Sequence, residues 1–290
     1  MTSRRELLGL LAGLPLLSLS RPALAASRKR VITAPGGRRI TVTVWNASGE
    51  RQGYILFSHG FRSAPEFYPD WIAAWAGAGF EVHAPLHTDS LQHPLMDKPE
   101  GLPVWKTRVE DMRAVSRAIG ADYVCAGHSF GGLMALVAGG VTAETPEGIT
   151  GPLADPRARA VIALSPPGPL KGLVSKEAFS HLARPALVQT GTRDVLPGRD
   201  DPESWREHLT AFAEALPSGD RHALLLEGVD HYFGGLVCDP AKTGPDQHAQ
   251  LALVSQVTLA FLARYAPGRD AENRAPLAAP RSPLLRLYHK

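Results

Sequence analysis

The sequence predicts an α/β fold in which a mostly parallel sheet is covered by helices on both faces. Short apolar runs rich in branched residues alternate with longer helical patterns, an order typical of parallel sheets. Hydrophobic residues make up 44% and charged residues 20% of the chain, which excludes a disordered protein. The length of 290 residues suits one large domain, which we expect over residues 26–265.

The expected strands are short apolar or β-branched runs, most of them bounded by turn residues. In chain order they cover residues 40–45, 54–57, 80–84, 122–126, 160–164, 186–189 and 223–226. Helical patterns separate them at residues 65–78, 105–119, 131–140, 203–216 and 248–265. Sites in such sheets form at the carboxyl ends of the strands, so the residues that follow each strand are the candidates for function.

Residues 1–25 have the features of a bacterial export signal. Arg4 and Arg5 stand before the apolar run 7–19, which is too short to span a bilayer as a helix. Paired arginines in this place resemble a twin-arginine signal, and residues 23–25, Ala-Leu-Ala, supply a cleavage site. A general secretory signal and a retained membrane anchor are the alternatives. We expect a periplasmic or secreted protein with no stable membrane anchor after cleavage.

The charge balance and the cysteine and histidine spacing of the rest of the chain suit a protein that acts on a small molecule. Removal of residues 1–25 leaves 28 basic against 27 acidic residues, which gives no reason to expect a nucleic-acid or acidic-lipid partner. No histidine or cysteine cluster has the spacing of metal ligands, so no metal site is expected. Cys125 and Cys238 are either free thiols or one disulfide. The Pro-rich residues 266–290 are expected to be a surface or disordered tail.

The segment Gly127-His128-Ser129-Phe130-Gly131 lies between the fourth expected strand and a small-residue helical pattern. A Gly-x-Ser-x-Gly motif in that setting is typical of a nucleophile elbow, whose strained turn raises the serine hydroxyl above the sheet. Glycines flank the serine because side chains there would collide with the neighbouring strand or helix. The motif alone is weak, so the assignment of Ser129 as nucleophile depends on a base and an acid at nearby strand ends.

An acid and a histidine follow the last two expected strands. Asp194 ends the segment Gly-Thr-Arg-Asp after the strand at 186–189, and His231 follows the final strand. We predict His231 as the general base and Asp194 as the acid that orients it, with Asp200 or Asp201 as alternatives for the acid. The order serine, aspartate, histidine differs from that of the two best-known serine protease folds.

The turn His59-Gly60-Phe61 after the second expected strand is a candidate oxyanion hole. A tetrahedral intermediate needs two donors, and we assign them to the backbone N–H groups of Phe61 and Phe130. His59 is expected to brace this loop by hydrogen bonding. His128, beside the serine, is expected to point away from the site and to be structural.

These four segments together resemble the α/β-hydrolase superfamily over roughly residues 50–265. Within that range, residues 59–85 look similar to bacterial dienelactone-hydrolase-like and platelet-activating-factor-acetylhydrolase-like esterases. Dienelactone hydrolases proper use a cysteine nucleophile, whereas this chain has Ser129, so lactone specificity is not carried over. The resemblance implies an α/β-hydrolase fold and a Ser-His-Asp triad, and it needs no cofactor.

The expected activity is the hydrolysis of a small carboxylic ester through an acyl-enzyme. Only residues 165–184 remain for a cap, so we expect an open cleft with a minimal lid, and the Pro-rich loop 86–104 as a further wall. Phe61, Phe130, Tyr232 and Phe233 are candidates for an apolar substrate pocket, with core packing as the alternative. A peptidase or polyester depolymerase, or a non-catalytic binding protein with this fold, are the other readings of function.

Overall fold

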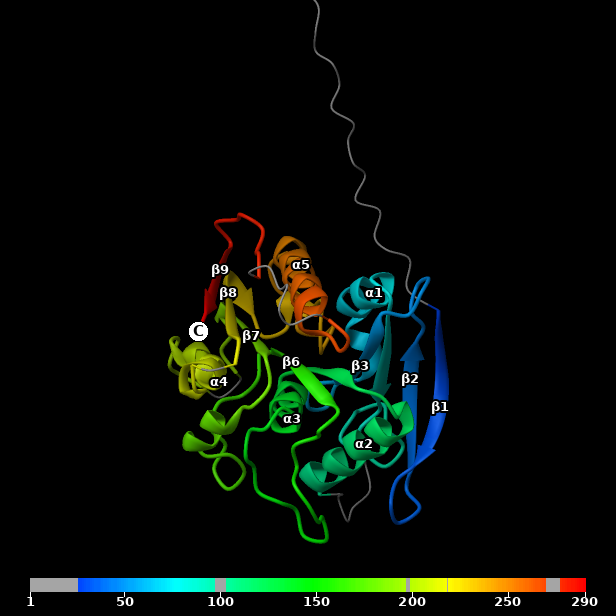
Figure 1. Ribbon diagram of the computed structural model, residues 1–290. Helices are drawn as coiled ribbons and strands as arrows, with labels where there is room; N and C mark the ends of the chain where they lie inside the picture. The colour runs from blue at the N-terminus through cyan, green and yellow to red at the C-terminus, as the bar shows by residue number, and fades with distance from the viewer. Residues whose placement is uncertain (1–25, 97–102, 197–198, 218, 270–276) are drawn as a thin grey trace, which may run out of the picture.

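A nine-stranded sheet forms the centre of the computed structural model, which describes residues 26–96, 103–196, 199–217, 219–269 and 277–290 (Figure 1). The strand order is β1-β2-β4-β3-β5-β6-β7-β8-β9. From β4 to β8 all neighbours are parallel, whereas β1, β2 and β9 run antiparallel to the strands beside them. The strands are β1 (Ser27–Thr33), β2 (Arg39–Trp45), β3 (Gly53–Ser58), β4 (Phe80–Pro85), β5 (Tyr123–His128), β6 (Ala158–Leu164), β7 (Ala186–Arg193), β8 (Arg221–Asp230) and β9 (Leu285–His289).

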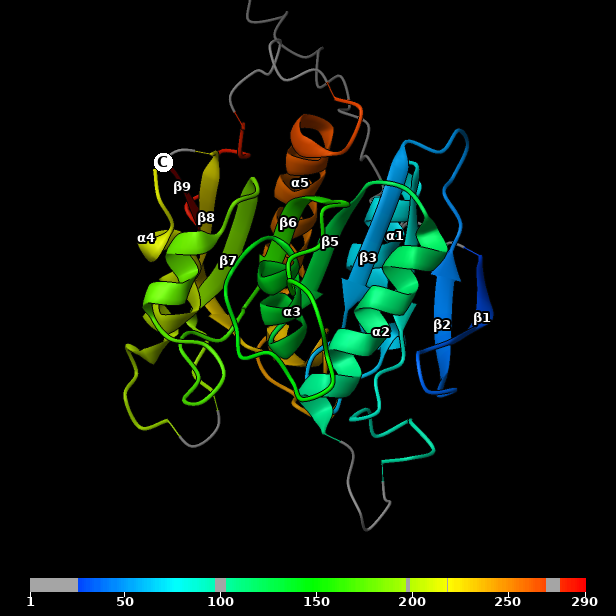
Figure 2. The same ribbon diagram turned by 60° about the horizontal axis from the view of Figure 1, so that its bottom comes forward.

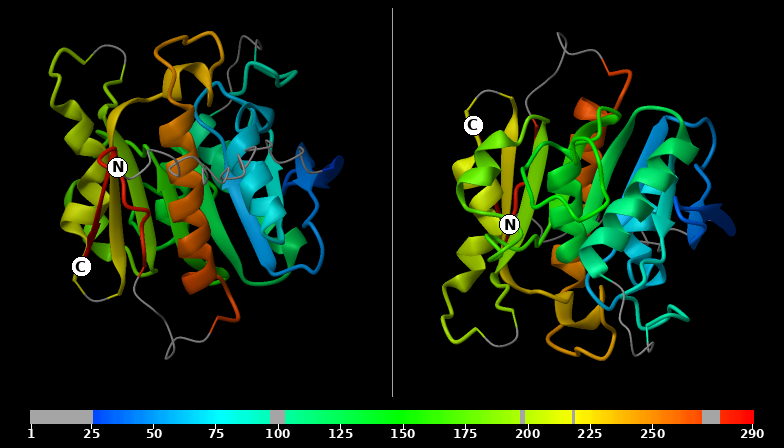
Figure 3. Two further views of the ribbon diagram at one scale, coloured as in Figure 1. Left: turned by 90° about the horizontal axis from the view of Figure 1, so that it is seen from above. Right: turned by 90° about the horizontal axis from the view of Figure 1, so that it is seen from below.

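Helices cover both faces of this sheet, as predicted. Helices α1 and α5 lie on one face, and α2, α3 and α4 lie on the other (Figure 2 and Figure 3). The α-helices are α1 (Pro69–Gly77), α2 (Val104–Ile119), α3 (Phe130–Ala138), α4 (Thr210–Glu214) and α5 (His248–Tyr265). Short 3-10 turns are η1 (Pro65–Phe67), η2 (Glu177–His181), η3 (Ser204–Leu209) and η4 (Phe233–Gly235).

Two cores result, one on each side of the sheet. Every residue of β5 is buried, because helices shield both of its faces. On the α1–α5 side the indole N–H of Trp75 donates to the hydroxyl of Thr258 at 3.0 Å, which ties the two helices together inside an otherwise apolar layer. On the other side α2 ends at Gly120, whose φ of 70° is the left-handed conformation that glycine adopts without strain.

The outer strands and two helices differ from the sequence prediction. The tail expected over residues 266–290 contains β9, which pairs with β8 from Leu226↔Leu285 to His222↔His289. The hairpin strand β1 is also additional to the predicted set. The helix expected at 65–78 is divided into η1 and α1, because Pro69 begins a new helix. The helix expected at 203–216 is η3 followed by the short α4.

The parallel strands bring four loops to one edge of the sheet. Strands β3, β5, β7 and β8 end at Ser58, His128, Arg193 and Asp230, and the loops that follow them carry the predicted site. The predicted export signal, residues 1–25, lies outside the described residues. Among the helices of the described part of the chain, none combines the length and hydropathy that a bilayer crossing requires.

Candidate active site

The predicted nucleophile lies on a strained turn between β5 and α3. Ser129 has φ 54° and ψ −124°, and its N–H donates to the carbonyl of Leu164 at 2.8 Å. A side chain at Gly127 would come within 2.1 Å of the Gly131 carbonyl oxygen, and one at Gly131 within 1.9 Å of the Ser58 carbonyl oxygen. Only glycine fits at either position. The strain at Ser129 costs on the order of 1–3 kcal/mol and is tolerated because the surrounding backbone fixes the turn.

The predicted base and acid are hydrogen-bonded to each other. His231 Nδ1 lies 2.7 Å from Asp194 Oδ1, and both residues are buried at the ends of β8 and β7. The other carboxylate oxygen of Asp194 accepts from the Thr190 hydroxyl at 2.8 Å. The alternatives Asp200 and Asp201 are exposed, so the aspartate paired with the histidine is Asp194. A bond at Nδ1 leaves Nε2 of His231 for proton transfer.

A second histidine, His208 in η3, also contacts the predicted acid. Its Nδ1 lies 2.7 Å from the Pro166 carbonyl oxygen, and its Nε2 lies 3.1 Å from both the backbone oxygen and Oδ1 of Asp194. Both ring nitrogens therefore face only acceptors, which requires a doubly protonated ring. Burial lowers the pKa of His208, but the Asp194 carboxylate outweighs it, and the net shift is upward.

The carboxyl of Asp194 is correspondingly held ionised. Burial raises its pKa, but His231 and His208 more than offset this, and the pKa lies well below its usual value. Sequence reasoning missed His208, because it belongs to no motif and follows the acid only after a loop. Its place against Asp194 depends on the way η3 packs on β7.

Both residues of the predicted oxyanion hole border the same cavity as Ser129. Phe130 is the first residue of α3, where the backbone N–H has no partner within the helix. Within the described residues the N–H of Phe61 has no protein acceptor. Gly60 is required beside Phe61, because a side chain there would come within 2.7 Å of Cys238 Sγ. The two N–H groups are thus available for a bound oxygen atom.

His59 and His128 have the structural roles that the sequence predicted. His59 Nδ1 donates to the Gly60 carbonyl at 2.7 Å, and its Nε2 accepts from the backbone N–H of His87 at 3.0 Å. His128 Nε2 donates to the His231 carbonyl at 3.1 Å, and its Nδ1 accepts from the Tyr68 hydroxyl at 3.2 Å. Burial lowers the pKa of both histidines well below the usual value, so both rings are neutral.

A buried serine–histidine–aspartate chain lies behind the oxyanion loop. Ser58 Oγ is 2.9 Å from His87 Nε2, and His87 Nδ1 is 2.8 Å from Asp111 Oδ2. These distances resemble those of a catalytic triad, but all three residues are fully buried and none of them lines the cavity. These three hydrogen-bonded side chains therefore support the end of β3 structurally.

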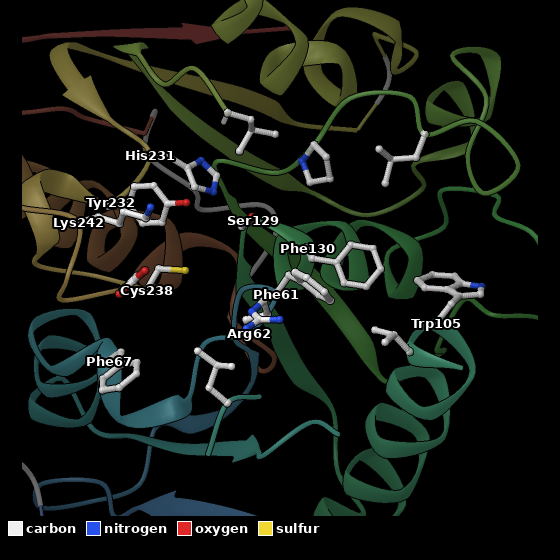
Figure 4. Close-up of a pocket in the computed structure, with 16 residues that line it drawn as sticks. Phe61, Arg62, Phe67, Trp105, Ser129, Phe130, His231, Tyr232, Cys238 and Lys242 are labelled. Atoms are coloured by element: carbon white, nitrogen blue, oxygen red, sulfur yellow. The ribbon is translucent and has the colours of Figure 1, made fainter. Parts of the chain in front are cut away.

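The cavity beside Ser129 has a volume of about 830 Å³ and mostly apolar walls. In Figure 4, Ser129 and His231 border the same hollow as Phe61 and Phe130, with Tyr232 and Cys238 on one side and Trp105 on the other. Its rim includes residues of the predicted cap and of the loop after β4, namely Pro167, Leu170 and Leu91. Among the described residues no hydrogen bond joins Ser129 Oγ to His231.

One of the residues predicted to contact substrate does not line the cavity. Phe61 and Tyr232 line the cavity, but Phe233 is fully buried in the core, where its ring meets Trp71 edge-on with centroids 5.5 Å apart. The prediction of Phe233 as a substrate contact is wrong, because the chain turns into η4 directly after Tyr232 and points the next side chain inward. Both cysteines are free thiols, and burial raises the pKa of each.

Two groups of side chains in the described parts of the chain lie close enough to share a metal ion. Asp194, His208 and His231 are held together by N–H donors between the rings and the carboxylate, which leaves no common open position. The other group is Asp220, His222 and His289. There the rings of His222 and His289 stack, with centroids 4.5 Å apart and an angle of 16° between their planes. Their in-plane lone pairs therefore do not converge on one point. Neither group fits a metal in this arrangement.

No protein-family model matches the sequence, and no curated protein matches it. Solved structures do. The esterase domain of a Rhodothermus marinus protein is 18% identical, with 83% of this chain and 99% of that chain covered and a TM-score of 0.53. An alpha-beta serine hydrolase homologue from Coxiella burnetii is 16% identical, covering 81% and 97%, with a TM-score of 0.57. A putative dienelactone hydrolase from Klebsiella pneumoniae subsp. pneumoniae MGH 78578 is 16% identical, covering 83% and 100%, with a TM-score of 0.55. The chain therefore has the α/β-hydrolase fold.

Proposed function

We propose that this protein is a serine hydrolase that cleaves carboxylic esters through an acyl-enzyme on Ser129. The observation that carries the proposal is the 2.7 Å bond between His231 Nδ1 and Asp194 Oδ1 at the cavity into which the strained Ser129 turn opens. An acid that fixes the ring through Nδ1 directs the basic Nε2 toward a nucleophile. The similarity to solved esterase, serine hydrolase and peptidase structures supports a hydrolase.

In the first step Ser129 Oγ attacks the ester carbonyl while His231 Nε2 takes the hydroxyl proton. Asp194 remains ionised and stabilises the imidazolium that forms. The negative charge on the carbonyl oxygen is met by the N–H groups of Phe61 and Phe130. His231 then returns the proton to the departing alcohol, and the acyl group stays on Ser129. In the second step His231 takes a proton from a water molecule as the water oxygen attacks the acyl carbon. His231 then returns the proton to Ser129 Oγ as the acyl–serine bond breaks, which releases the acid.

The walls of the cavity favour a small, mostly apolar ester. Phe61, Phe67, Trp105 and Phe130 present aromatic surface to the cavity, and a cavity of about 830 Å³ holds a drug-sized molecule. None of the described residues that line the cavity belongs to one of the nine strands, so these walls offer no strand edge to a peptide backbone. This composition makes a peptidase the less favoured reading.

The test combines active-site labelling with hydrolysis assays. We expect a fluorophosphonate probe to label wild type at Ser129, which peptide mass spectrometry can locate, and Ser129→Ala to lose labelling and turnover. Ser180→Ala removes a hydroxyl that donates to the Glu177 carbonyl and does not line the cavity, so this variant should behave as wild type. Asp194→Asn should lower kcat by about 10⁴-fold, because the wrong histidine tautomer is then favoured.

The alternatives give different results in the same assays. Substrates are p-nitrophenyl esters of increasing acyl length and the matching p-nitroanilides. Faster cleavage of anilides than of esters would favour a peptidase. Wild type that is folded but neither labelled nor active would leave a non-catalytic binding protein as the explanation.

A further inference from the structure

The side chain of Arg108, on α2, is fully buried beneath the loop that follows β3. All five of its N–H groups have acceptors. Nε and Nη2 donate to the two carboxylate oxygens of Asp89 at 2.9 and 2.8 Å. Nη1 donates to Ser58 Oγ at 3.2 Å and to the His59 carbonyl at 2.8 Å, and Nη2 also donates to the Gly60 carbonyl at 3.1 Å. A planar guanidinium satisfied in this way has one orientation.

The bond to the Gly60 carbonyl helps to determine where the Phe61 N–H points. These two groups belong to one peptide unit, and the described residues contain no cis peptide bond. In a trans peptide the C=O and N–H point in opposite directions. With its carbonyl directed at Arg108, this peptide must direct the Phe61 N–H away from the buried guanidinium. The same carbonyl also accepts from His59 Nδ1 at 2.7 Å and from the Ser63 N–H at 3.2 Å.

The neighbouring peptide is held at both ends. Its carbonyl, from His59, accepts from Arg108, and its N–H, from Gly60, donates to the Tyr68 hydroxyl at 2.9 Å. On the other side, the Arg62 N–H donates to Asp89 Oδ2 at 3.2 Å. The Phe61 N–H is therefore the one backbone donor of residues 60–62 that has no protein acceptor in the described structure.

Arg108 also contacts the second predicted donor residue. Its Cζ lies 5.0 Å from the centre of the Phe130 ring, within the range of a cation–π contact. Burial raises the pKa of Asp89, but Arg108 more than offsets this and holds the carboxyl ionised. One buried ion pair thus borders both residues whose amides are predicted to bind the oxyanion.

We propose that Arg108 is a positioning residue, which orients the Phe61 amide toward the oxyanion before substrate binds; the proposal rests on the function proposed above. A donor already oriented costs no reorganisation when charge develops on the substrate oxygen. Without the guanidinium, the Gly60 carbonyl loses its charged donor and keeps the bonds from His59 Nδ1 and the Ser63 N–H, while the His59 carbonyl loses its donor at 2.8 Å. The Gly60–Phe61 peptide is then held less firmly. The expected loss is confined to the transition state, because the ground-state ester oxygen carries little charge.

The variants must separate this role from stability of the ion pair. Arg108→Gln alone leaves Asp89 as a buried unpaired charge, which can unfold the protein. The double variant Arg108→Gln/Asp89→Asn removes both charges and keeps an acceptor for the Arg62 N–H. Arg108→Lys keeps the charge balance, but the lysine ammonium cannot bind all the acceptors that the guanidinium binds. Arg113→Gln is the control, because Arg113 is on the same helix and holds the carbonyls of a distant loop, at Thr150, Gly151 and Pro152.

Turnover is measured per folded site, with thermal unfolding of each variant recorded in parallel. We expect Arg108→Lys and the double variant to lose about 10- to 100-fold in kcat with KM nearly unchanged, as for partial loss of an oxyanion donor. Affinity for a trifluoromethyl ketone, which forms the tetrahedral oxyanion, should fall by the same factor. Affinity for the matching secondary alcohol, which cannot form it, should not change, and Arg113→Gln should match wild type.

Each outcome decides the proposal. Wild-type kcat in the folded double variant, or equal losses of affinity for the ketone and the alcohol, would overturn the role of Arg108 while leaving the hydrolase intact. No turnover by wild type would overturn the proposed function and this role with it.

Discussion

Replacement of His208 by glutamine tests the imidazolium behind the predicted acid. The wild-type ring is 3% exposed and donates to the Pro166 carbonyl and to Asp194. Glutamine has a similar length but carries no charge, and its amide can serve one of the two acceptors at most. The variant should therefore fold with a weakened contact between η3 and the end of β7.

The size of the effect follows from the two hydrogen bonds. A buried hydrogen bond from a charged donor contributes about 1.5–3 kcal/mol, so the pair contributes about 3–6 kcal/mol. Because glutamine retains part of one bond, we expect His208→Gln to lower the free energy of unfolding by about 2–4 kcal/mol at pH 6.

The loss should depend on pH with a defined sign. The pKa of His208 is raised in the folded protein above the ordinary value of 6.5. Its stabilisation is then complete below pH 6.5 and disappears as the pH rises through the folded-state pKa. The variant has no such proton, so the difference between wild type and variant should be large at pH 6 and smaller at pH 9.

Urea unfolding followed by tryptophan fluorescence at both pH values measures this difference. His248→Gln is the control: that histidine is exposed and paired with the exposed Asp246, so its replacement should cost less than about 0.5 kcal/mol. A cost of His208→Gln that is equal at the two pH values, or larger at pH 9, would refute a protonated His208.

Two further predictions concern the elbow and the N-terminus. Gly131→Ala places a methyl group 1.9 Å from the Ser58 carbonyl oxygen and should lower the free energy of unfolding by about 3 kcal/mol or more. The control Gly77→Ala meets nothing within 4 Å and should raise the free energy of unfolding by up to about 1 kcal/mol. Similar effects of the two changes would contradict this packing argument. We also propose that residues 1–25 direct export. Cell fractionation should find the wild-type protein outside the cytoplasm, with its N-terminus directly after Ala25. The variant Arg4→Lys/Arg5→Lys should remain in the cytoplasm. Undiminished export of the double variant would favour a general secretory signal.

The sheet and the elbow were predictable because their causes are local. Each inner strand is a short apolar run, and a strand covered on both faces needs little else in its sequence. The glycines around Ser129 are dictated by contacts under 2.2 Å that any side chain would make. The edge strands were not predictable in the same way. Strand β1 is exposed along almost its whole length, and β9 pairs with a strand more than fifty residues earlier.

Sequence alone predicted Ser129, Asp194 and His231 as the site, because each follows a strand in a recognisable segment and parallel strands end at one edge. The tertiary structure decided which of the neighbouring side chains serve them. Phe233 turns into the core, His208 donates to the acid, and Arg108 binds the carbonyls behind the oxyanion loop. No local pattern separates such an arginine or histidine from an ordinary polar residue of a helix. Their charge acquires its role only when folding removes water and leaves one set of acceptors within reach.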